Sequence, residues 1–276
     1  MNKPLTAAAL AMSASLACAV SAAEPSPAIV DAVNGAQRTP ALAARDVSRH
    51  PGPTLAFFGI APDMSVLEIW PGKSGWYTEI LAPLLREDGQ LTVAIFGDQT
   101  DQHRDFMLSA NQTFQDKLAA DPEVYDRVDV VSLWPPGQTT IGDDASYDMV
   151  VTFRNLHNWM AWGQTDDMLE TLYRVLKPGG ILGVIDHRAR AGAEIDPLAR
   201  SGYVDQQRAI DLITAAGFEF VASSEINANP KDTADHPRGV WTLPPTLAMG
   251  ADADNSSYLA IGESDRFTLT FRKPEG

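Results

Sequence analysis

The feature that most constrains the fold is a regular alternation of strand and helix patterns that begins at Asp63. Short apolar runs bounded by Gly and Pro turns predict strands, and apolar residues at helical spacing between those runs predict helices. The predicted strands are 65–70, 90–96, 128–133, 147–153, 181–186, 218–225 and 266–272, and the predicted helices are 76–86, 101–120, 164–176 and 204–216. Strands separated by helices are joined by right-handed crossovers, so we predict an α/β, doubly wound, mostly parallel sheet with both faces covered.

The last predicted strand has a different pattern from the others. Phe267, Leu269 and Phe271 alternate with polar residues. Such alternation is typical of a strand with one face in the core and one in solvent, so we expect a half-buried edge strand here.

The loops after the first, second, fourth and fifth strands are the expected ligand sites, because ligands bind doubly wound sheets at the carboxyl ends of the strands. The first of these loops contains Glu68, Trp70, Gly72 and Gly75. Glycines at a strand-to-helix turn let the backbone approach a ligand, and the start of the next helix offers free N–H groups. This loop is therefore a candidate binding segment.

The loop after the fourth strand has the most distinctive polar sequence, Arg154-Asn155-Leu156-His157-Asn158-Trp159. His157 is interpreted as a general base or a substrate-orienting residue, and the alternative is a hydrogen-bonded structural histidine. A second polar cluster, Asp186-His187-Arg188, directly follows the fifth strand. It faces the first loop across the site, or else Asp186 and Arg188 pair with each other.

Three motifs in this order resemble the class I S-adenosylmethionine-dependent methyltransferase superfamily: the loop 68–78, the strand 147–151 and the turn 176–180. Together they cover most of residues 64–186. The resemblance implies a Rossmann-like methyltransferase fold with seven strands, the last of them antiparallel, and S-adenosylmethionine as the cofactor. Further segments are similar to a bacterial group of exported, predicted methyltransferases, namely 70–72, 154–159, 186–188, 225–230 and 262–265.

The resemblance also implies roles for single residues. Glu68 acts near the methionine end of the cofactor or holds the loop, and Asp98 accepts hydrogen bonds from the ribose, with a simple turn residue as the alternative. The chain departs from the family pattern at Trp70 and Ser74, where the family has glycines, and the tryptophan is expected to crowd the turn. The expected cofactor-binding residues are Glu68, Trp70, Gly72, Gly75, Asp98 and Asn155.

The same loops supply the other candidate site residues. The expected catalytic residues are His157 and His187, and the expected substrate-binding residues are Arg154, Asn158, Arg188, Asn227 and Asn229. Asn227 and Asn229 belong to a loop insertion at about 226–264, which is typical of a lid or substrate-specific element; the alternative is an ordered surface loop. We expect no metal site, because the histidines offer no short-spaced ligand pair.

The N-terminus predicts export. Lys3 precedes an uncharged apolar run and small residues at 21–23, which is typical of a signal peptide over 1–23 that is cleaved near Ala23. The product is then periplasmic or secreted, and the alternative is a lipoprotein acylated at Cys18. No segment is long enough to predict a membrane span. We divide the remainder into an N-terminal helical arm at 24–60 and a single methyltransferase-like domain at 61–276.

The acidic composition indicates which classes of binding partner to expect. The net charge of −15 argues against nucleic acid and anionic membranes, so a small-molecule substrate is expected. The leading hypothesis is S-adenosylmethionine-dependent methyl transfer to a small acceptor. The alternative is an exported, non-catalytic small-molecule binding protein on the same fold, which the altered glycine loop and the uncertain supply of cofactor outside the cytoplasm favour. A different chemistry on this fold stays open, and the sequence predicts no oligomeric state.

Overall fold

The computed structural model describes residues 24–98, 104–250 and 253–276. The predicted signal peptide at 1–23 and the alternative acylation site Cys18 lie outside the described residues.

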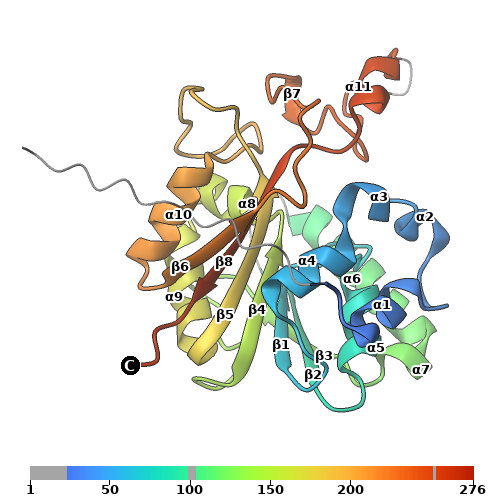
Figure 1. Cartoon of the computed structure of the whole chain (residues 1–276), viewed down its shortest axis with the longest axis vertical. Helices are drawn as coiled ribbons and strands as arrows, with labels where there is room; N and C mark the ends of the chain where they lie inside the picture. Colours follow the sequence, from blue (N-terminus) through green and yellow to red (C-terminus); the bar gives the residue numbers. More distant parts are fainter. Residues whose placement is uncertain (1–23, 99–103, 251–252) are drawn as a thin grey trace, which may run out of the picture.

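Seven strands form one sheet in the order β3-β2-β1-β4-β5-β8-β6 (Figure 1). The strands of this sheet are β1 (Ser65–Ile69), β2 (Gln90–Phe96), β3 (Asp129–Leu133), β4 (Tyr147–Phe153), β5 (Leu176–His187), β6 (Glu219–Ser224) and β8 (Arg266–Arg272). The first five pair in parallel, and β8 lies antiparallel between β5 and β6. The predicted doubly wound, Rossmann-like methyltransferase fold with an antiparallel last strand is confirmed.

The prediction that β8 is a half-buried edge strand is wrong. β5 and β6 flank it, and Phe267, Thr268 and Leu269 are all fully buried. The hydroxyl of Thr268 accepts a hydrogen bond at 2.9 Å from Nδ2 of Asn227, which belongs to the segment between β6 and β8. The alternation therefore does not mark a solvated face, because Thr268 is buried and hydrogen-bonded to Asn227.

The fifth strand begins earlier than predicted. The turn expected at 176–180 lies within β5, where the pairing with β4 shifts register between Tyr147 and Met149. Gly179 adopts a φ of 77° there, a left-handed conformation that glycine takes without steric cost. The motif therefore forms a bulge inside a continuous strand.

Helices cover both faces of the sheet, and each face has its own hydrophobic core (Figure 1). On one side lie α1 (Pro27–Asn34), α4 (Pro51–Phe58), α5 (Thr78–Leu85), α6 (Arg104–Ala120) and α7 (Pro122–Tyr125). On the other lie α8 (Leu156–Ala161), α9 (Thr165–Val175) and α10 (Gln206–Ala215). Within the described ranges, none of the helices has the length and apolar character to cross a membrane.

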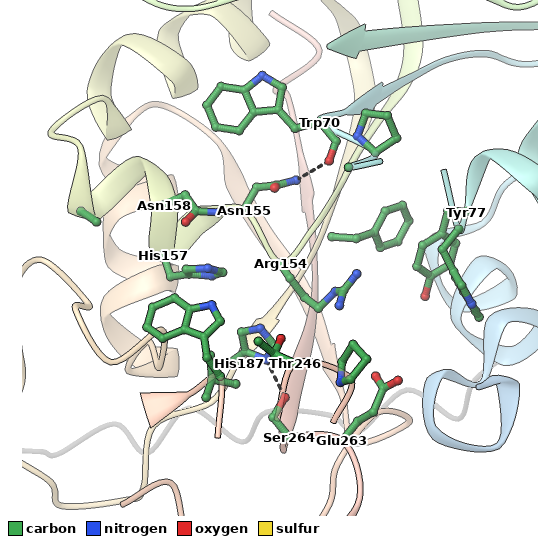
Figure 2. Close-up of a pocket in the computed structure, with 18 of the residues that line it drawn as sticks. Trp70, Tyr77, Arg154, Asn155, His157, Asn158, His187, Thr246, Glu263 and Ser264 are labelled. Atoms are coloured by element: carbon green, nitrogen blue, oxygen red, sulfur yellow. Dashed lines mark hydrogen bonds between the residues drawn. The ribbon is translucent and has the colours of Figure 1, made fainter. Parts of the chain in front are cut away.

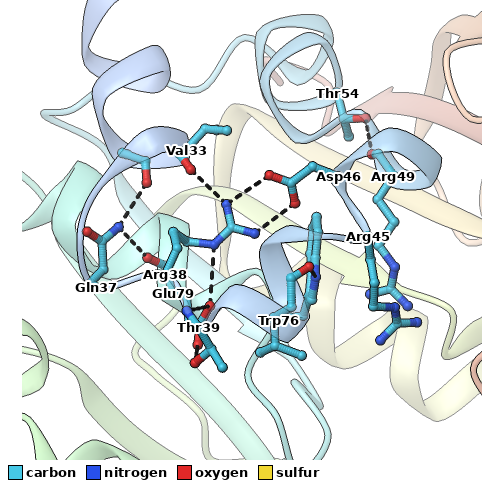
Figure 3. A network of polar contacts seen from close by, with 12 residues as sticks. Val33, Gln37, Arg38, Thr39, Arg45, Asp46, Arg49, Thr54, Trp76 and Glu79 are labelled. Carbon is cyan, nitrogen blue, oxygen red and sulfur yellow. Dashed lines mark hydrogen bonds and ion pairs between the residues drawn. The ribbon is translucent and has the colours of Figure 1, made fainter.

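The N-terminal segment packs tightly against α5. Arg38 pairs with Asp46 at 2.8 Å and with Glu79 of α5 at 3.3 Å (Figure 3). Within the predicted helical arm, this part of the chain forms two short helices, α2 (Pro40–Ala43) and α3 (Asp46–Arg49). The chain then turns at His50, whose φ is 41°, and Pro51 begins α4, because a proline suits the first helical position.

The segment between β6 and β8 contains β7 (Pro237–Val240) and α11 (Ser256–Ile261). Figure 1 shows both beyond the end of the sheet at which β4 runs into α8. This arrangement brings the late part of the chain over the carboxyl ends of the central strands.

Candidate active site

A pocket of about 480 Å³ opens at the carboxyl ends of β1, β4 and β5 (Figure 2). Strand order reverses between β1 and β4, which is where ligands bind doubly wound sheets, and the volume is in the range of small-molecule sites. The expected site residues that line it are Glu68, Trp70, Gly72, Arg154, Asn155, His157, Asn158 and His187. The topology thus brings the loops after β1, β4 and β5 together.

Glu68 is a buried acid near the carboxyl end of β1 and lines the pocket. The hydroxyl of Thr78, in the first turn of α5, donates a hydrogen bond to Oε2 of Glu68 at 2.7 Å. Burial raises the pKa of Glu68 to about 7, against the opposing effect of that hydrogen bond. Near neutral pH this carboxyl group is therefore divided between its neutral and ionised forms.

The two glycines of the first loop have different surroundings. Gly72 has a φ of 66°, and a Cβ there would meet no atom within 4 Å, so the backbone is open toward the pocket. Gly75 has a φ of 55°, and a Cβ there would lie 2.7 Å from the ring of Phe114 in α6. Gly75 does not line the pocket, and a glycine is needed at this position because α6 approaches the backbone closely.

Trp70 is buried in an aromatic cluster. Its backbone takes the left-handed region with a φ of 44°, and its indole N–H donates to the carbonyl oxygen of Leu133 at 3.2 Å. The ring lies 4.9 Å from Phe96, 5.7 Å from Trp134 and 5.8 Å from Trp162, measured between centroids. The backbone of Trp70 therefore forms part of the turn, and its indole ring packs over the ends of β2 and β3.

The loop after β4 begins with a residue in a strained backbone conformation, Arg154, and a residue that is hydrogen-bonded to the loop after β1, Asn155. Arg154 has a φ of 64°, a conformation that costs a non-glycine residue about 1–3 kcal/mol and is most common at functional sites. The amide of Asn155 donates to the carbonyl oxygens of Ile69 at 2.9 Å and Trp70 at 3.4 Å. Asn155 thus ties the loop after β4 to the loop after β1.

His157 is oriented by a buried carboxylate. Its Nδ1 lies 2.8 Å from Oδ1 of Asp186, and its backbone N–H donates to Oδ2 at 3.0 Å. Asp186 also accepts the backbone N–H of His187 at 2.7 Å. The alternative in which Asp186 pairs with Arg188 is wrong, because these three donors from His157 and His187 occupy the carboxylate.

His187 lies beside His157, with 5.3 Å between the ring centroids. Its Nδ1 lies 2.5 Å from the hydroxyl of Ser264. Burial, the neighbouring His157 and the arginines Arg154, Arg266 and Arg49 hold the pKa of His187 well below its usual range. The imidazole is therefore neutral at physiological pH.

Potential ligand atoms of His157, Asp186 and His187 all lie within 4.8 Å of one another. The oxygens of Asp186 already accept three N–H groups, and the nearby guanidinium groups disfavour a cation. The cluster fits an oriented acid–base pair better than a metal centre, and the absence of a metal stays a prediction.

The late insertion supplies the wall opposite the β4 loop. Trp241, Pro244 and Thr246 line the pocket, and the ring of Trp241 lies 6.1 Å from that of His157. Glu263 and Ser264, just before β8, complete this side. None of these residues was predicted individually. Their signs in the sequence were the predicted insertion at about 226–264 and, for Glu263 and Ser264, the similar segment 262–265.

Several expected site residues lie outside the pocket. Asp98 is exposed beyond β2, and its backbone N–H donates to Oε1 of Gln138 at 2.8 Å. Arg188 pairs with Asp265 at 2.8 Å and Glu225 at 2.7 Å. Asn227 donates to the hydroxyls of Thr54 and Thr268, and Asn229 to the carbonyl oxygens of Ile261 and Glu263. These two asparagines fix the insertion to the fold.

No protein-family model matches the chain. The highly reducing polyketide synthase azaB of Aspergillus niger is 35% identical over 123 residues, which are 44% of this chain but 4% of that synthase. The match therefore spans a small fraction of the curated relative.

Solved structures show what the fold is similar to. A SAM-dependent methyltransferase from Aquifex aeolicus matches with a TM-score of 0.55 and 16% identity, covering 86% of this chain and 94% of that one. The [4+2]-cyclase SpnF matches with a TM-score of 0.53 and 18% identity, covering 85% and 82%. A putative sarcosine dimethylglycine methyltransferase from Galdieria sulphuraria matches with a TM-score of 0.53 and 13% identity, covering 84% and 87%. The chain thus has the fold of the S-adenosylmethionine-dependent methyltransferases, on which at least one solved protein is a cyclase.

Proposed function

We propose that this protein transfers a methyl group from S-adenosylmethionine to a small acceptor outside the cytoplasm. The observation that carries the proposal is the pocket at the strand-order reversal, where an open glycine turn and an Asp186–His157 pair face the same cavity. The fold similarity supports the class of reaction, and the pocket volume suits a small substrate.

The pocket lining fits the cofactor in its chemistry. Trp70, Phe96 and Trp162 form an aromatic wall suited to a purine, and the backbone at Gly72 is open to a ligand. Glu68 offers a carboxyl group beside this turn. When bound, S-adenosylmethionine would supply an activated methyl group, so the protein needs no nucleophilic side chain of its own.

In this proposal the residues of the chain position the acceptor and hold its proton. Asp186 orients the imidazole of His157, whose Nε2 is left to accept a proton from the acceptor's oxygen, nitrogen or carbon. Holding the acceptor in line with the methyl group provides most of the acceleration. His187, neutral and hydrogen-bonded to Ser264, is the second candidate for this role.

The second candidate function is an exported, non-catalytic small-molecule binding protein. Trp70 favours it, because the indole stands where the family has a glycine and contributes a large aromatic surface to the pocket. Such a protein needs the pocket but not the Asp186–His157 pair.

Turnover tests the proposal. We expect the protein to form S-adenosylhomocysteine from S-adenosylmethionine with at least one acceptor in a panel of small hydroxyl, amine and carbon nucleophiles. His157→Ala should abolish this turnover and leave cofactor affinity unchanged. The matched control is His236→Ala, since His236 forms an equivalent pair with Asp232 at 2.8 Å but does not line the pocket. Equal loss of turnover in both variants would show that His157 has only a structural role.

A further inference from the structure

One side of the pocket carries an excess of positive charge. Three guanidinium groups contact the carboxylate of Glu263: Arg45 at 2.7 Å, Arg49 at 3.0 Å and Arg266 at 3.1 Å. Arg154 is the fourth arginine in electrostatic contact with this carboxylate. We call these five residues the arginine cluster; its formal charge is +3, because four cations face one anion.

The cluster is assembled from distant parts of the chain. Arg45 and Arg49 come from the N-terminal segment around α3 (Figure 3), Arg154 follows β4, and Glu263 and Arg266 flank the start of β8. Burial opposes ionisation of Glu263, but Arg49, Arg266 and Arg45 outweigh it and lower the pKa of Glu263 to about 2. Glu263 is therefore fully ionised and still does not balance the charge.

Many N–H donors in the arginine cluster are unused. Both terminal nitrogens of Arg49, one of Arg45 and Nε of Arg266 are buried without a hydrogen-bond partner among the described residues. Such groups are costly, since a buried polar group without a partner loses its hydration. An acceptor-rich anion near them would reduce this cost.

Among the described residues, Arg154 is the one arginine of the cluster that lines the cavity, and Glu263 lines it as well. Figure 2 shows its guanidinium group projecting into the pocket between the histidines and Tyr77. Within the described part of the chain no hydrogen bond or ion pair restrains that group. Burial raises the pKa of Tyr77 to about 12, so this residue is a neutral hydroxyl donor beside the cation.

A guanidinium group that lines a cavity fits an oxyanion, because its planar arrangement of N–H donors matches carboxylate and phosphate oxygens. The overall charge of −15 makes the local excess more notable, since the rest of the molecule repels anions. Among the described residues that line the pocket, Arg154 is the one arginine or lysine, so an entering ligand meets positive charge on the side of the arginine cluster.

We infer that Arg154, supported by the arginine cluster, binds a carboxylate or phosphate group of the ligand that occupies the pocket. The assignment of this anionic group to the cofactor or the substrate rests on the proposed function. The anionic group then belongs either to the methionine part of the cofactor or to an acidic acceptor, and both sources present the same chemistry to Arg154.

Inorganic phosphate tests the anion site without a cofactor. We expect sodium phosphate to raise the Tm of the protein above its value in sodium chloride of equal ionic strength, and Arg154→Gln to weaken the apparent phosphate affinity at least tenfold. Arg200→Gln is the matched control, because Arg200 is exposed and its ion-pair partner among the described residues is Asp196, outside the pocket. In chloride alone Arg154→Gln should be at least as stable as the wild type, since it removes an unpaired charge. Equal effects of phosphate and chloride, or an equal phosphate response in Arg154→Gln, would overturn the inference.

Two nucleosides distinguish the sources of the anion. S-adenosylmethionine carries a carboxylate, whereas 5′-methylthioadenosine lacks the amino-acid part. If Arg154→Gln weakens binding of only the former, the subsite holds the cofactor's carboxylate; if it changes neither, the anion belongs to the acceptor. If the wild type binds neither nucleoside, the proposed function fails, and the phosphate response still decides the anion site.

Discussion

Nδ1 of His157 lies 2.8 Å from Oδ1 of Asp186, and this contact joins the loop after β4 to the end of β5. Asp186 is fully buried and accepts two further backbone N–H groups. A carboxylate can only accept hydrogen bonds, so Nδ1 is the protonated nitrogen of the neutral imidazole. Nε2 is then left as the proton acceptor.

The first prediction concerns this tautomer. We expect ¹⁵N NMR of the imidazoles to show His157 protonated at Nδ1 and His236 protonated at Nε2, because Asp232 contacts His236 through Nε2 at 2.8 Å. Asp186→Asn should redistribute the tautomers of His157 and leave His236 unchanged. A His157 protonated at Nε2 in the wild type would contradict its assignment as the base.

The positions of Asp186 and His157 could be predicted from the sequence, but the contact between them could not. Both were expected at the same edge of the sheet, because parallel strands end there together. The sequence could not show that the chain after Asn155 forms α8 and places the imidazole over Asp186. The nearest cation in sequence, Arg188, instead pairs with Asp265 and Glu225, which enter from β6 and β8.

Stability should depend on pH through Glu68. Its pKa is raised from 4.5 to about 7 in the folded state, so the folded protein binds this proton more tightly than the unfolded chain. The resulting stabilisation is fully present below pH 4.5 and is lost as the pH rises through about 7, an effect on the order of 3 kcal/mol. Glu68→Gln should remove this slope in denaturant titrations between those pH values. Parallel curves for the two proteins would contradict the assigned burial effect.

Glu263 should be essential for stability, because it is the counter-ion of three arginines. Glu263→Gln leaves these guanidinium groups uncompensated and should lower the free energy of unfolding by about 3–5 kcal/mol. The control Glu225→Gln removes an exposed partner of Arg188 and should cost at most about 1 kcal/mol. Equal losses in urea titrations would argue against the arginine cluster as a buried, charge-imbalanced site.

The arginine cluster could not be predicted from the sequence. Arg154 was selected because it follows β4, but Arg45, Arg49 and Glu263 were not. Their contacts join residues more than two hundred positions apart, such as Arg49 and Glu263, and no periodicity in the sequence reports such a pairing. β2, β4 and β8 match their predicted bounds, because each is defined by its own local apolar pattern.

Trp70 should support the fold as well as line the site. Trp70→Gly restores the glycine of the family pattern but removes a buried indole and its hydrogen bond to Leu133, so we expect a loss of about 3–5 kcal/mol in unfolding free energy. Trp241→Gly, at a residue that is 38% exposed, should cost less. A Trp70→Gly protein that keeps its stability and gains cofactor affinity would show that the indole obstructs the pocket.

The central claim is that the pocket at the ends of β1, β4 and β5 holds S-adenosylmethionine. Calorimetric titration of the protein with S-adenosylmethionine and S-adenosylhomocysteine tests this most directly. We expect binding with at least micromolar affinity, which is lost when Gly72→Val fills the open turn and is retained in His236→Ala. No heat of binding and no rise in Tm at millimolar concentrations of either compound would contradict it.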